Sequence, residues 1–429
     1  MDLEKIKKVH FIGVGGISVS AIARMMLDLG KVVSGSDSSF SRITKELEEI
    51  GAQIFIGQKA ENLSDDTDLV VYTIAIPEEN PELKKARDLK IKCLSYPEML
   101  GTISEDFYTI AVSGTHGKTT TTAMLSDVLI KSGLKPNVII GSLLREQGSN
   151  YVKGDSKYFL VEACEYRRSF LNLKPKILII NNIEEDHLDY YKDLDDIKSA
   201  FKSMVSKVSG NGFIVCNPSD PNLGGALEGA KAEIVDYTEF IEKDLGLKVP
   251  GEHNISNAGV VLAVSDILDI EKYKTREILQ SYSGVWRRFE FKGETKEGIL
   301  VYDDYAHHPT EVKTTLEGAS NYFEGKIVVI FQPHLYSRTK KFLNQFAKSF
   351  NNVDEVVILP IYAAREAEDK TINSEMLVEE INKNGGNANY KKDFDEAILY
   401  VKERLNKGGV LMTIGAGDVY KIGEGMLND

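Results

Sequence analysis

Two glycine-rich segments of this chain have the residue types and the spacing that bind phosphate groups. The first, within "FIGVGGISVSA", places Gly13, Gly15 and Gly16 between an apolar run and a stretch with helical spacing. The second, "VSGTHGKTTTT", adds Lys118 and Thr119 at the start of another helix-like stretch. Glycines let backbone N–H groups approach phosphate oxygens, and a helix N-terminus favours negative charge. Each segment therefore predicts an anion site at a strand-to-helix turn.

The second glycine segment indicates nucleoside triphosphate chemistry. Residues 114–117 form its turn, Lys118 offers a point charge to a phosphate, and the hydroxyl of Thr119 is placed to reach Mg²⁺. Its match to the common phosphate loop is incomplete, because Val112 stands where that loop has its first glycine. The simpler alternative is a glycine-rich turn with a surface lysine, which the flanking strand and helix patterns disfavour.

Acidic residues and histidines gather where apolar strands are expected to end. "YFLVEA" ends on Glu162, and "ILIINN" runs into Asp186 and His187. The segments that hold His307 and His334 also follow apolar runs. Ligands gather at the carboxyl edge of an α/β sheet, and a carboxylate suits a hard cation. A helix cap with an exposed imidazole explains Asp186 or His187 taken singly.

The hydrophobic pattern supplies three successive α/β units to hold these side chains. Short apolar runs alternate with amphipathic stretches in all three. We predict a Rossmann-like domain at 1–103, a central phosphate-loop domain with a mostly parallel sheet at 104–284, and a Rossmann-like C-terminal domain at 285–429.

Length and composition exclude several classes of protein. The 429 residues are too many for one compact core, and no apolar stretch approaches the roughly 20 residues needed to span a bilayer. The N-terminus lacks a signal peptide, so we expect a cytoplasmic protein. A formal charge of -13 disfavours nucleic acid as a partner. Cys93, Cys164 and Cys216 form no CxxC pair, and reduced thiols are expected.

A set of short motifs carries a resemblance to a known family. In chain order they are "GTHGKTTTT", "EACEY..SFL", "NIEEDHLDYY", "GEHNISNA", "RRFE", "DDYAHHPTE", "FQPHLYSRT" and "GAGD". The set resembles the Mur ligases of peptidoglycan synthesis over nearly the whole chain. The resemblance implies an N-terminal UDP-sugar domain, a central ATPase domain and a C-terminal amino-acid domain.

The resemblance also implies a two-step reaction. ATP would phosphorylate the lactyl carboxylate of UDP-N-acetylmuramic acid, and the amine of L-alanine would then attack the acyl phosphate. The implied cofactors are ATP and Mg²⁺, with Mn²⁺ as a substitute, and the enzyme would be a monomer or a homodimer. Which group removes the proton of the alanine ammonium stays open.

The resemblance assigns site residues one motif at a time. The ATP site would comprise Gly114, Thr115, His116, Gly117, Lys118, Thr119, Thr120, Asn254, Asn257 and Arg287. The UDP-sugar site would comprise Gly13, Gly15, Gly16, Ser20, Asp37 and Arg288. The amino-acid site would comprise Tyr305, His307, His334 and Arg338. The metal ligands would be Thr119, Glu162 and His187, and the catalytic residues Lys118, His187, His307, His334 and Arg338.

The sequence departs from the family pattern at several places. Cys164 stands where many members have an acidic residue, which leaves Glu162 as the firmer ligand and Glu165 as a supporting candidate behind it. Leu335 replaces a residue that is often basic, which leaves open whether that position contacts a phosphate. Between 236 and 250 the chain is shorter than is usual in the family, which predicts a trimmed minor sheet in the central domain.

Three other interpretations of the sequence compete with ligation of L-alanine. A dehydrogenase is suggested by the first glycine segment and by Asp37, which stands where a ribose-binding acid belongs, but it does not account for "GTHGKTT". A sister ligase would join a whole tripeptide to the same UDP-sugar, and the "HLYSR" stretch favours the free amino acid. A nucleotide-binding relative without ligase activity would lack a key position, whereas Lys118, Thr119 and Glu162 are all present.

Overall fold

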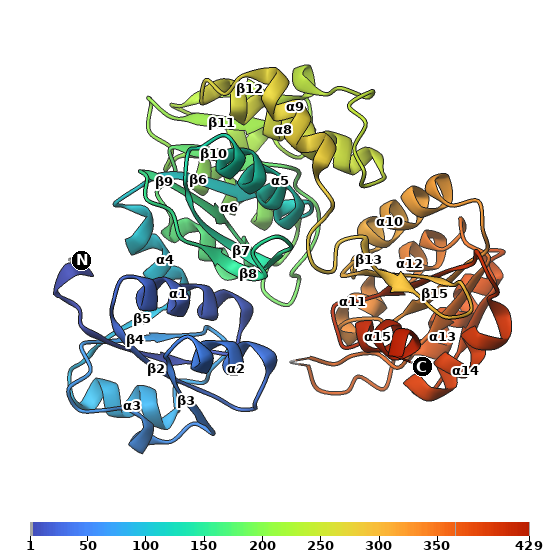
Figure 1. Cartoon of the computed structure of the whole chain (residues 1–429), viewed down its shortest axis with the longest axis horizontal. Coiled ribbons are helices and arrows are strands. Elements are labelled where there is room, and N and C mark those ends of the chain that lie inside the picture. The colour runs from blue at the N-terminus through green and yellow to red at the C-terminus, as the bar shows by residue number, and fades with distance from the viewer. Residues whose placement is uncertain (1–2, 365, 429) are drawn as a thin grey trace. The chain divides into compact units, whose positions relative to one another are not determined.

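The computed structural model describes residues 3–364 and 366–428, and the chain divides into two compact units. The first comprises Met1–Glu185, Asp193–Ile241 and Asn257–Leu279, and the second comprises Asp186–Lys192, Glu242–Ser256 and Gln280–Asp429. Three mostly parallel sheets follow one another along the chain, which confirms the predicted fold class (Figure 1). No helix within the described ranges is long and apolar enough to cross a membrane.

The first sheet is parallel, with the strand order β3-β2-β1-β4-β5. Its strands are β1 (Lys8–Ile12), β2 (Val32–Asp37), β3 (Gln53–Ile56), β4 (Leu69–Tyr72) and β5 (Lys92–Ser95). Its helices are α1 (Ile17–Asp28), α2 (Arg42–Glu49), α3 (Pro81–Asp88) and α4 (Tyr96–Ser104). The strand order reverses at β1, so the first glycine segment lies at the switch point where α/β sheets bind ligands.

The second sheet has seven strands in the order β12-β11-β10-β6-β9-β7-β8, and β8 alone is antiparallel to its neighbour. Its strands are β6 (Tyr108–Ser113), β7 (Asn137–Leu144), β8 (Ser149–Val152), β9 (Tyr158–Glu162), β10 (Ile177–Ile180), β11 (Phe213–Cys216) and β12 (Glu233–Asp236). The helices are α5 (Lys118–Lys131), α6 (Leu194–Val205), α7 (Gly224–Leu227), α8 (Glu252–Ile267) and α9 (Lys272–Ser281). The hairpin of β7 and β8 is an element that the sequence analysis did not predict.

The third sheet lies in the second unit, with the order β13-β14-β18-β15-β16-β17. Its strands are β13 (Glu290–Glu294), β14 (Leu300–Asp304), β15 (Ile327–Phe331), β16 (Glu355–Ile358), β17 (Ala388–Tyr390) and β18 (Val410–Ile414). Its helices are α10 (Pro309–Tyr322), α11 (Tyr336–Lys341), α12 (Leu343–Ser349), α13 (Ser374–Lys383), α14 (Phe394–Arg404) and α15 (Tyr420–Asn428). Apolar clusters cover both faces of this sheet, as a buried parallel sheet requires.

The central domain has no strand between β12 and α8 among the residues that the structure describes. Residues 237–240 form a short 3-10 helix, and the chain then runs irregularly to α8. The trimming of a minor sheet relative to the family stays a prediction. The domain boundaries at 103/104 and 284/285 stay predictions, although each falls between two of the observed sheets.

Candidate functional site

The second glycine segment forms the turn between β6 and α5. Gly117 caps α5 with a φ of +79°, and Gly114 has a φ of +128°, angles that side chains other than glycine disfavour. A Cβ atom on Gly117 would lie 2.7 Å from Asn257 Oδ1, so a larger residue there would have to displace the Asn257 side chain. The N-terminus of α5 therefore opens on this turn and can receive an anion.

Lys118 lies at the first position of α5, with its ammonium group drawn back onto the turn. Its Nζ donates to the carbonyl oxygens of Gly114 at 2.5 Å and Thr115 at 3.0 Å, and it pairs with Glu165 at 3.0 Å. Burial favours the neutral amine, but the negative charge of Glu165 outweighs it, so the pKa of Lys118 lies above its usual value. Lys118 is therefore a permanent cation at the phosphate turn.

A hydroxyl and a carboxylate meet beside this lysine. Thr119 Oγ1 lies 3.1 Å and 3.0 Å from the two carboxylate oxygens of Glu162, and the N–H of Gly141 donates to Glu162 Oε2 at 2.9 Å. Such oxygen donors fit Mg²⁺, whose shell is completed by water and phosphate oxygens. His187, the third predicted ligand, belongs to the second unit and has a φ of +54°.

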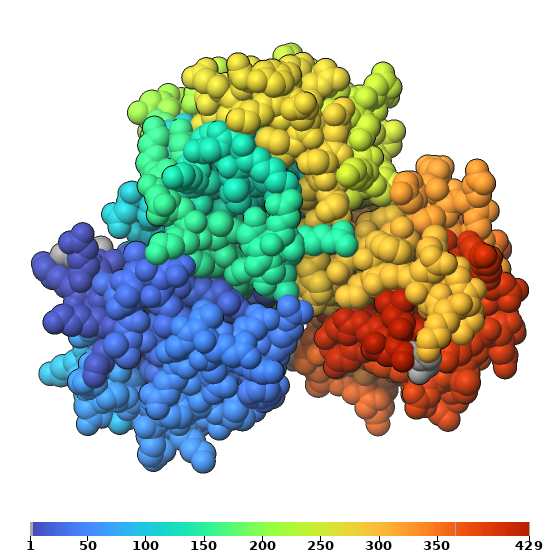
Figure 2. Space-filling view, in the orientation of Figure 1, coloured from blue at the N-terminus to red at the C-terminus, as the bar shows by residue number. Residues whose placement is uncertain are grey.

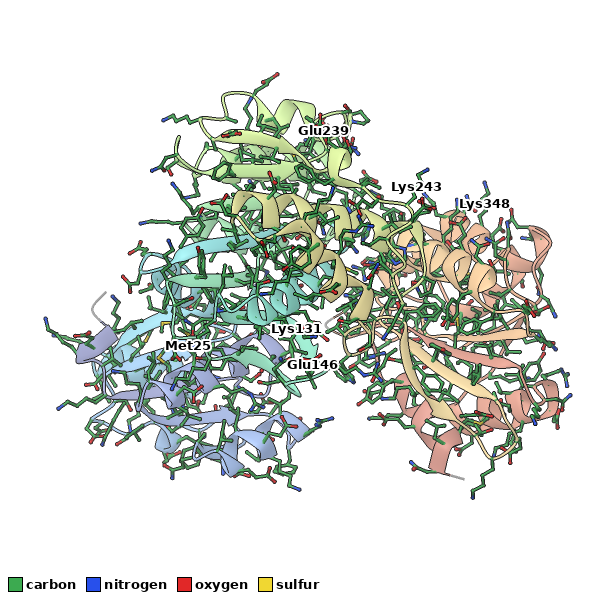
Figure 3. The ribbon with its side chains drawn as sticks, turned by 45° about the horizontal axis from the view of Figure 1, so that its top comes forward. Met25, Lys131, Glu146, Glu239, Lys243 and Lys348 are labelled. Atoms are coloured by element: carbon green, nitrogen blue, oxygen red, sulfur yellow. The ribbon has the colours of Figure 1, made fainter. Side chains whose placement is uncertain are left out.

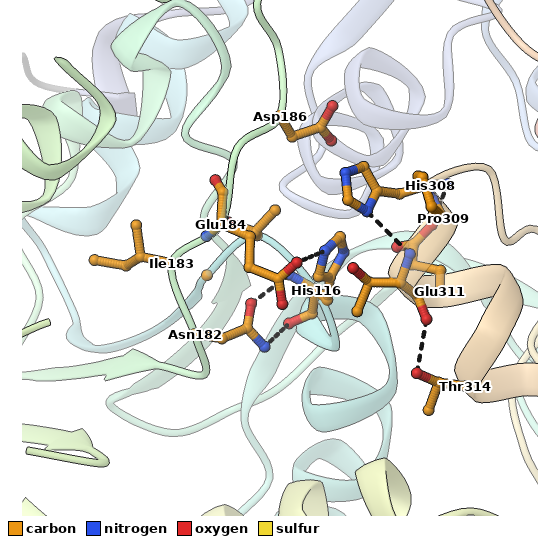
Figure 4. Close-up of polar contacts among 12 residues, drawn as sticks. His116, Asn182, Ile183, Glu184, Asp186, His308, Pro309, Glu311 and Thr314 are labelled. Atoms are coloured by element: carbon orange, nitrogen blue, oxygen red, sulfur yellow. Dashed lines mark hydrogen bonds and ion pairs between the residues drawn. The ribbon is translucent and has the colours of Figure 1, made fainter. Parts of the chain in front are cut away.

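Two asparagines that the sequence analysis did not single out hold the phosphate turn. The N–H of His116 donates to Asn182 Oδ1 at 2.8 Å, and the His116 ring lies 3.5 Å from the carboxylate of Glu184 (Figure 4). Asn181 Nδ2 donates to His116 O at 3.2 Å and to Thr121 Oγ1 at 3.1 Å. Both asparagines directly follow the buried strand β10, and that position was the available signal.

The first glycine segment forms the turn between β1 and α1. The carbonyl of Ser36 accepts from the N–H groups of Gly13 at 2.8 Å and Val14 at 3.0 Å. Asp37 Oδ2 accepts from the N–H of Gly15 at 2.8 Å, and a Cβ atom on Gly15 would lie 2.9 Å from the same oxygen. The end of β2 therefore fixes the conformation of this turn.

Ser20 is fully buried on α1. Its hydroxyl donates to Ile17 O at 3.0 Å and accepts from Asn150 Nδ2 at 2.8 Å. Asn150 lies on β8, and the space-filling view shows the hairpin directly against α1 (Figure 2). Ser20 thus joins two elements of the first unit, a structural function that the sequence analysis did not expect, and its contact with a phosphate stays a prediction.

One pocket of the first unit is lined by residues of both its N-terminal and its central part. Ser18 and Tyr96 come from the N-terminal part, and Gly141, Glu162 and Cys164 come from the central part. The side chains of Ser18 and Tyr96 form a hydrogen bond with each other, and burial raises the pKa of Tyr96. A ligand at the first turn that reaches into this pocket would therefore meet Glu162.

In the second unit, a buried arginine holds an acidic residue and a histidine. Arg338 donates to Asp186 Oδ1 at 2.7 Å and to His334 Nδ1 at 3.1 Å. Burial acts to raise the pKa of Asp186, but the charges of His187 and Arg338 outweigh it and hold that pKa well below its usual value. The structure therefore brings together Arg338 and His334, two residues of the predicted amino-acid site.

His307 lies beside this pair, with ring centroids 5.7 Å from His334 and 5.4 Å from Tyr305. Its Nδ1–H donates to Tyr305 O at 2.9 Å, which leaves the lone pair on Nε2. Burial lowers the pKa of His307 to about 4, and the nearby charge of Glu311 only partly opposes this shift. His307 is therefore a neutral imidazole at neutral pH.

We expect His307 to stay neutral at about pH 5.5 in the folded protein, because its pKa of about 4 lies below the usual histidine pKa of 6.5. Unfolding then adds a proton, so the stability contributed by the neutral ring is present above about pH 6.5 and is lost as the pH falls toward 4. Ring-carbon NMR shifts measure the charge state. His307→Gln should make the loss of stability with falling pH shallower; a His307 that titrates above pH 6 would contradict this.

Arg287 has a structural function that its predicted place at a phosphate did not include. Its side chain is buried and pairs with Asp303 at 2.8 Å, and it donates to the carbonyl oxygens of Gly417 at 3.0 Å and Gly415 at 2.5 Å. Arg287 thus ties β14 to the turn after β18. Asp303 was not singled out from the sequence, and a phosphate contact by Arg287 stays a prediction.

The other residues predicted for the site lie on several different elements. The guanidinium of Arg288 lies 5.3 Å from the ring centroid of Tyr305, and Asn254 donates to Pro250 O at 2.6 Å. Thr120 is half-buried on α5. Leu335 is buried with a φ of +70°.

Three family models that together match most of the chain define the class of the protein: the chain belongs to the Mur ligase family. Residues 8–108 match the model for the Mur ligase family, catalytic domain, residues 112–245 match the Mur ligase middle domain, and residues 287–417 match the Mur ligase, glutamate ligase domain.

Among named relatives, the chain is similar to UDP-N-acetylmuramate--L-alanine ligases. That of Clostridium kluyveri is 44% identical over 454 residues, which cover 100% of this chain and 99% of the relative. That of Caldanaerobacter subterraneus subsp. tengcongensis is 41% identical, with coverage of 100% and 99%. The crystal structure of UDP-N-acetylmuramate-alanine ligase MurC from Thermotoga maritima has a TM-score of 0.82 at 29% identity, with 98% of each chain covered.

Proposed function

We propose that this chain joins L-alanine to the lactyl carboxylate of UDP-N-acetylmuramate at the expense of ATP, in peptidoglycan synthesis. The relatives that match its full length are named UDP-N-acetylmuramate--L-alanine ligases. The observation that carries the proposal is the pocket lined by both Ser18 and Glu162. A UDP-sugar held at the first turn can present its carboxylate there to a phosphoryl group held at the second.

ATP activates the sugar's carboxylate. A carboxylate oxygen attacks the γ-phosphorus, and the bond to the β,γ-bridging oxygen breaks to release ADP. The amine of L-alanine then attacks the acyl carbon, and inorganic phosphate leaves. Lys118 and the N-terminus of α5 would offset charge on the transferring group, since phosphoryl transfer depends mainly on positioning and electrostatics.

Thr119 and Glu162 would hold Mg²⁺, with His187 as a further ligand and Mn²⁺ as a substitute for the metal. The ion, when bound, neutralises phosphate charge. We expect Glu162→Gln to raise the Mg²⁺ concentration for half-maximal activity by about tenfold or more, because one anionic ligand oxygen becomes an amide. Magnesium titrations of phosphate release measure it. Glu146→Gln, an exposed carboxylate on the β7–β8 turn, should behave as wild type. An unchanged magnesium requirement in Glu162→Gln would contradict the assignment.

The amino-acid site would lie at Tyr305, His307, His334 and Arg338. Arg338 would bind the alanine carboxylate through its planar fork of donors. The neutral Nε2 of His307 is available to accept a proton, as a base for the alanine ammonium must be. Asn254, Asn257 and Arg287 would complete the ATP site, and Asp37 and Arg288 the UDP-sugar site.

Phosphate release from ATP tests the proposal, with UDP-N-acetylmuramate and one amino acid at a time. L-alanine should give stoichiometric phosphate and a UDP-sugar product heavier by one alanine residue. Activity with the tripeptide alone would assign the chain to the sister activity, and nucleotide binding without phosphate release would make it a non-catalytic relative. Because the reaction consumes ATP, we place it in the cytoplasm. A monomer or homodimer, the expected state, is checked by sedimentation.

A further inference from the structure

The N-terminal part of the first unit buries a glutamate–histidine pair that the proposed chemistry does not use. Glu82 and His10 have fully buried side chains, and Glu82 Oε2 lies 3.2 Å from His10 Nε2. Glu82 is in the first turn of α3, and His10 is on β1, the strand that leads into the first glycine turn. A buried charge is costly unless hydrogen bonds satisfy it, and a hydrophobic residue of similar volume often serves stability better.

Both carboxylate oxygens of Glu82 accept hydrogen bonds from residues of other elements in the N-terminal part. Oε2 accepts from the hydroxyl of Ser36 at 2.6 Å. Oε1 accepts from Asn62 Nδ2 at 2.6 Å and from the backbone N–H of Lys59 at 3.1 Å. Burial acts to raise the pKa of Glu82, but the hydrogen bonds from His10, Ser36 and Asn62 outweigh it and lower that pKa. The carboxylate is ionised and fully satisfied.

Ser36 connects this carboxylate to the glycine turn. Its hydroxyl donates to Glu82, while its carbonyl accepts the N–H groups of Gly13 and Val14. The next residue is Asp37, whose carboxylate accepts the N–H of Gly15. A movement of Ser36 would therefore displace both supports of the turn. The turn is also closely packed at Gly13, where an added Cβ atom would lie only 2.4 Å from the side chain of Thr73.

We propose that Glu82 is a positioning residue for the UDP-sugar site: by holding Ser36 it fixes the glycine turn and Asp37 in the geometry that receives a nucleoside diphosphate. The inference rests on the proposed function, which makes this turn the UDP site. Glu82 makes no contact with substrate in this role. Its effect should be confined to the UDP-sugar and should leave ATP and alanine binding unchanged.

The test uses Glu82→Gln, Ser36→Ala and the double variant of the full-length protein. Glutamine keeps the shape of the side chain but has one acceptor oxygen in place of two, so it cannot accept hydrogen bonds from Ser36 on one side and from Asn62 and Lys59 on the other. We expect the Kd for UDP, measured by calorimetry without ATP, and the KM for UDP-N-acetylmuramate to rise about tenfold in each single variant. The KM for ATP and kcat should change little.

The double variant separates positioning from general destabilisation. If Glu82 acts through Ser36, the two substitutions remove the same interaction. The Kd of the double variant for UDP should then be no higher than that of the single variant that binds UDP more weakly. Fully additive losses would overturn this route. A lower Tm with an unchanged Kd for UDP in Glu82→Gln would also overturn the proposal, because the buried carboxylate would then serve stability alone.

A matched control is Glu355→Gln in the second unit. Glu355 is also a buried carboxylate, which accepts from Tyr400 Oη at 3.2 Å and pairs with Lys326 at 3.1 Å. This variant should lower the Tm and leave UDP binding unchanged. Wild-type protein that binds no UDP would overturn both the proposed function and this inference, whereas wild-type binding that Glu82→Gln leaves intact overturns the inference alone.

Discussion

Lys118→Ala should reduce kcat for alanine-dependent phosphate release by about a thousandfold or more. The ammonium group of Lys118 is buried at the phosphate turn and remains charged, because the carboxylate of Glu165 raises its pKa. When ATP binds, its phosphate oxygens can replace the carbonyls of Gly114 and Thr115 that the ammonium now contacts. Alanine at this position offers no charge to the transferring phosphoryl group.

The same helix provides the control for this prediction. Lys131 lies in the last turn of α5 and pairs with Glu146 at 2.7 Å, and Figure 3 labels both side chains. Lys131→Ala removes one lysine from α5 without touching the phosphate turn, so kcat should stay within about twofold of wild type. Phosphate release and binding of a non-hydrolysable ATP analogue are measured for both variants. If Lys118→Ala keeps most of its activity, the turn has no part in phosphoryl transfer.

Arg338→Lys should raise the KM for L-alanine by about a hundredfold, with little change in the KM values for ATP and UDP-N-acetylmuramate. Lysine keeps the positive charge beside Asp186, so the buried carboxylate is not left alone. Lysine lacks the planar guanidinium group with its five N–H donors. Arginine uses this group to contact Asp186 and His334, and it has further donors for a substrate carboxylate. The measurement is steady-state kinetics with each substrate varied in turn.

Lys340→Ala is the matched control on α11. Lys340 is exposed and pairs with Asp369 at 3.1 Å, so its loss should leave the KM for alanine unchanged. An Arg338→Lys variant whose KM for ATP rises as much as its KM for alanine would contradict the assignment. That result would show that Arg338 supports the second unit as a whole and not the amino-acid site.

Much of the fold could be predicted because buried parallel strands are nearly continuous apolar runs. "KVHFIG", "KILIINN" and "KIVVIFQ" contain β1, β10 and β15, each of which is buried almost throughout. The hairpin of β7 and β8 was not predicted, because its residues alternate weakly and its antiparallel pairing depends on the adjacent strand β9. β17 has only three residues, too few for a periodic signal.

The candidate site also has some features that the sequence could predict and others that it could not. The turn that leads through Gly117 into Lys118 and Thr119 could be recognised because a strand-to-helix glycine turn depends on residue type and local spacing. Partners distant in sequence could not be recognised: Arg287 with Asp303, or Arg338 with Asp186. An ion pair across many residues has no local pattern, since only the folded sheet brings the two side chains within hydrogen-bonding distance.

The sequence by itself determined the order of three α/β units and the two phosphate turns, because strand burial and glycine-rich turns are local properties of the chain. Only the tertiary structure decided which side chains support those turns. Glu82 and Ser36 are 46 residues apart, and nothing in either segment marks them as partners. Burial of their hydrogen bond depends on the packing of α3 against the sheet, which the sequence pattern does not specify.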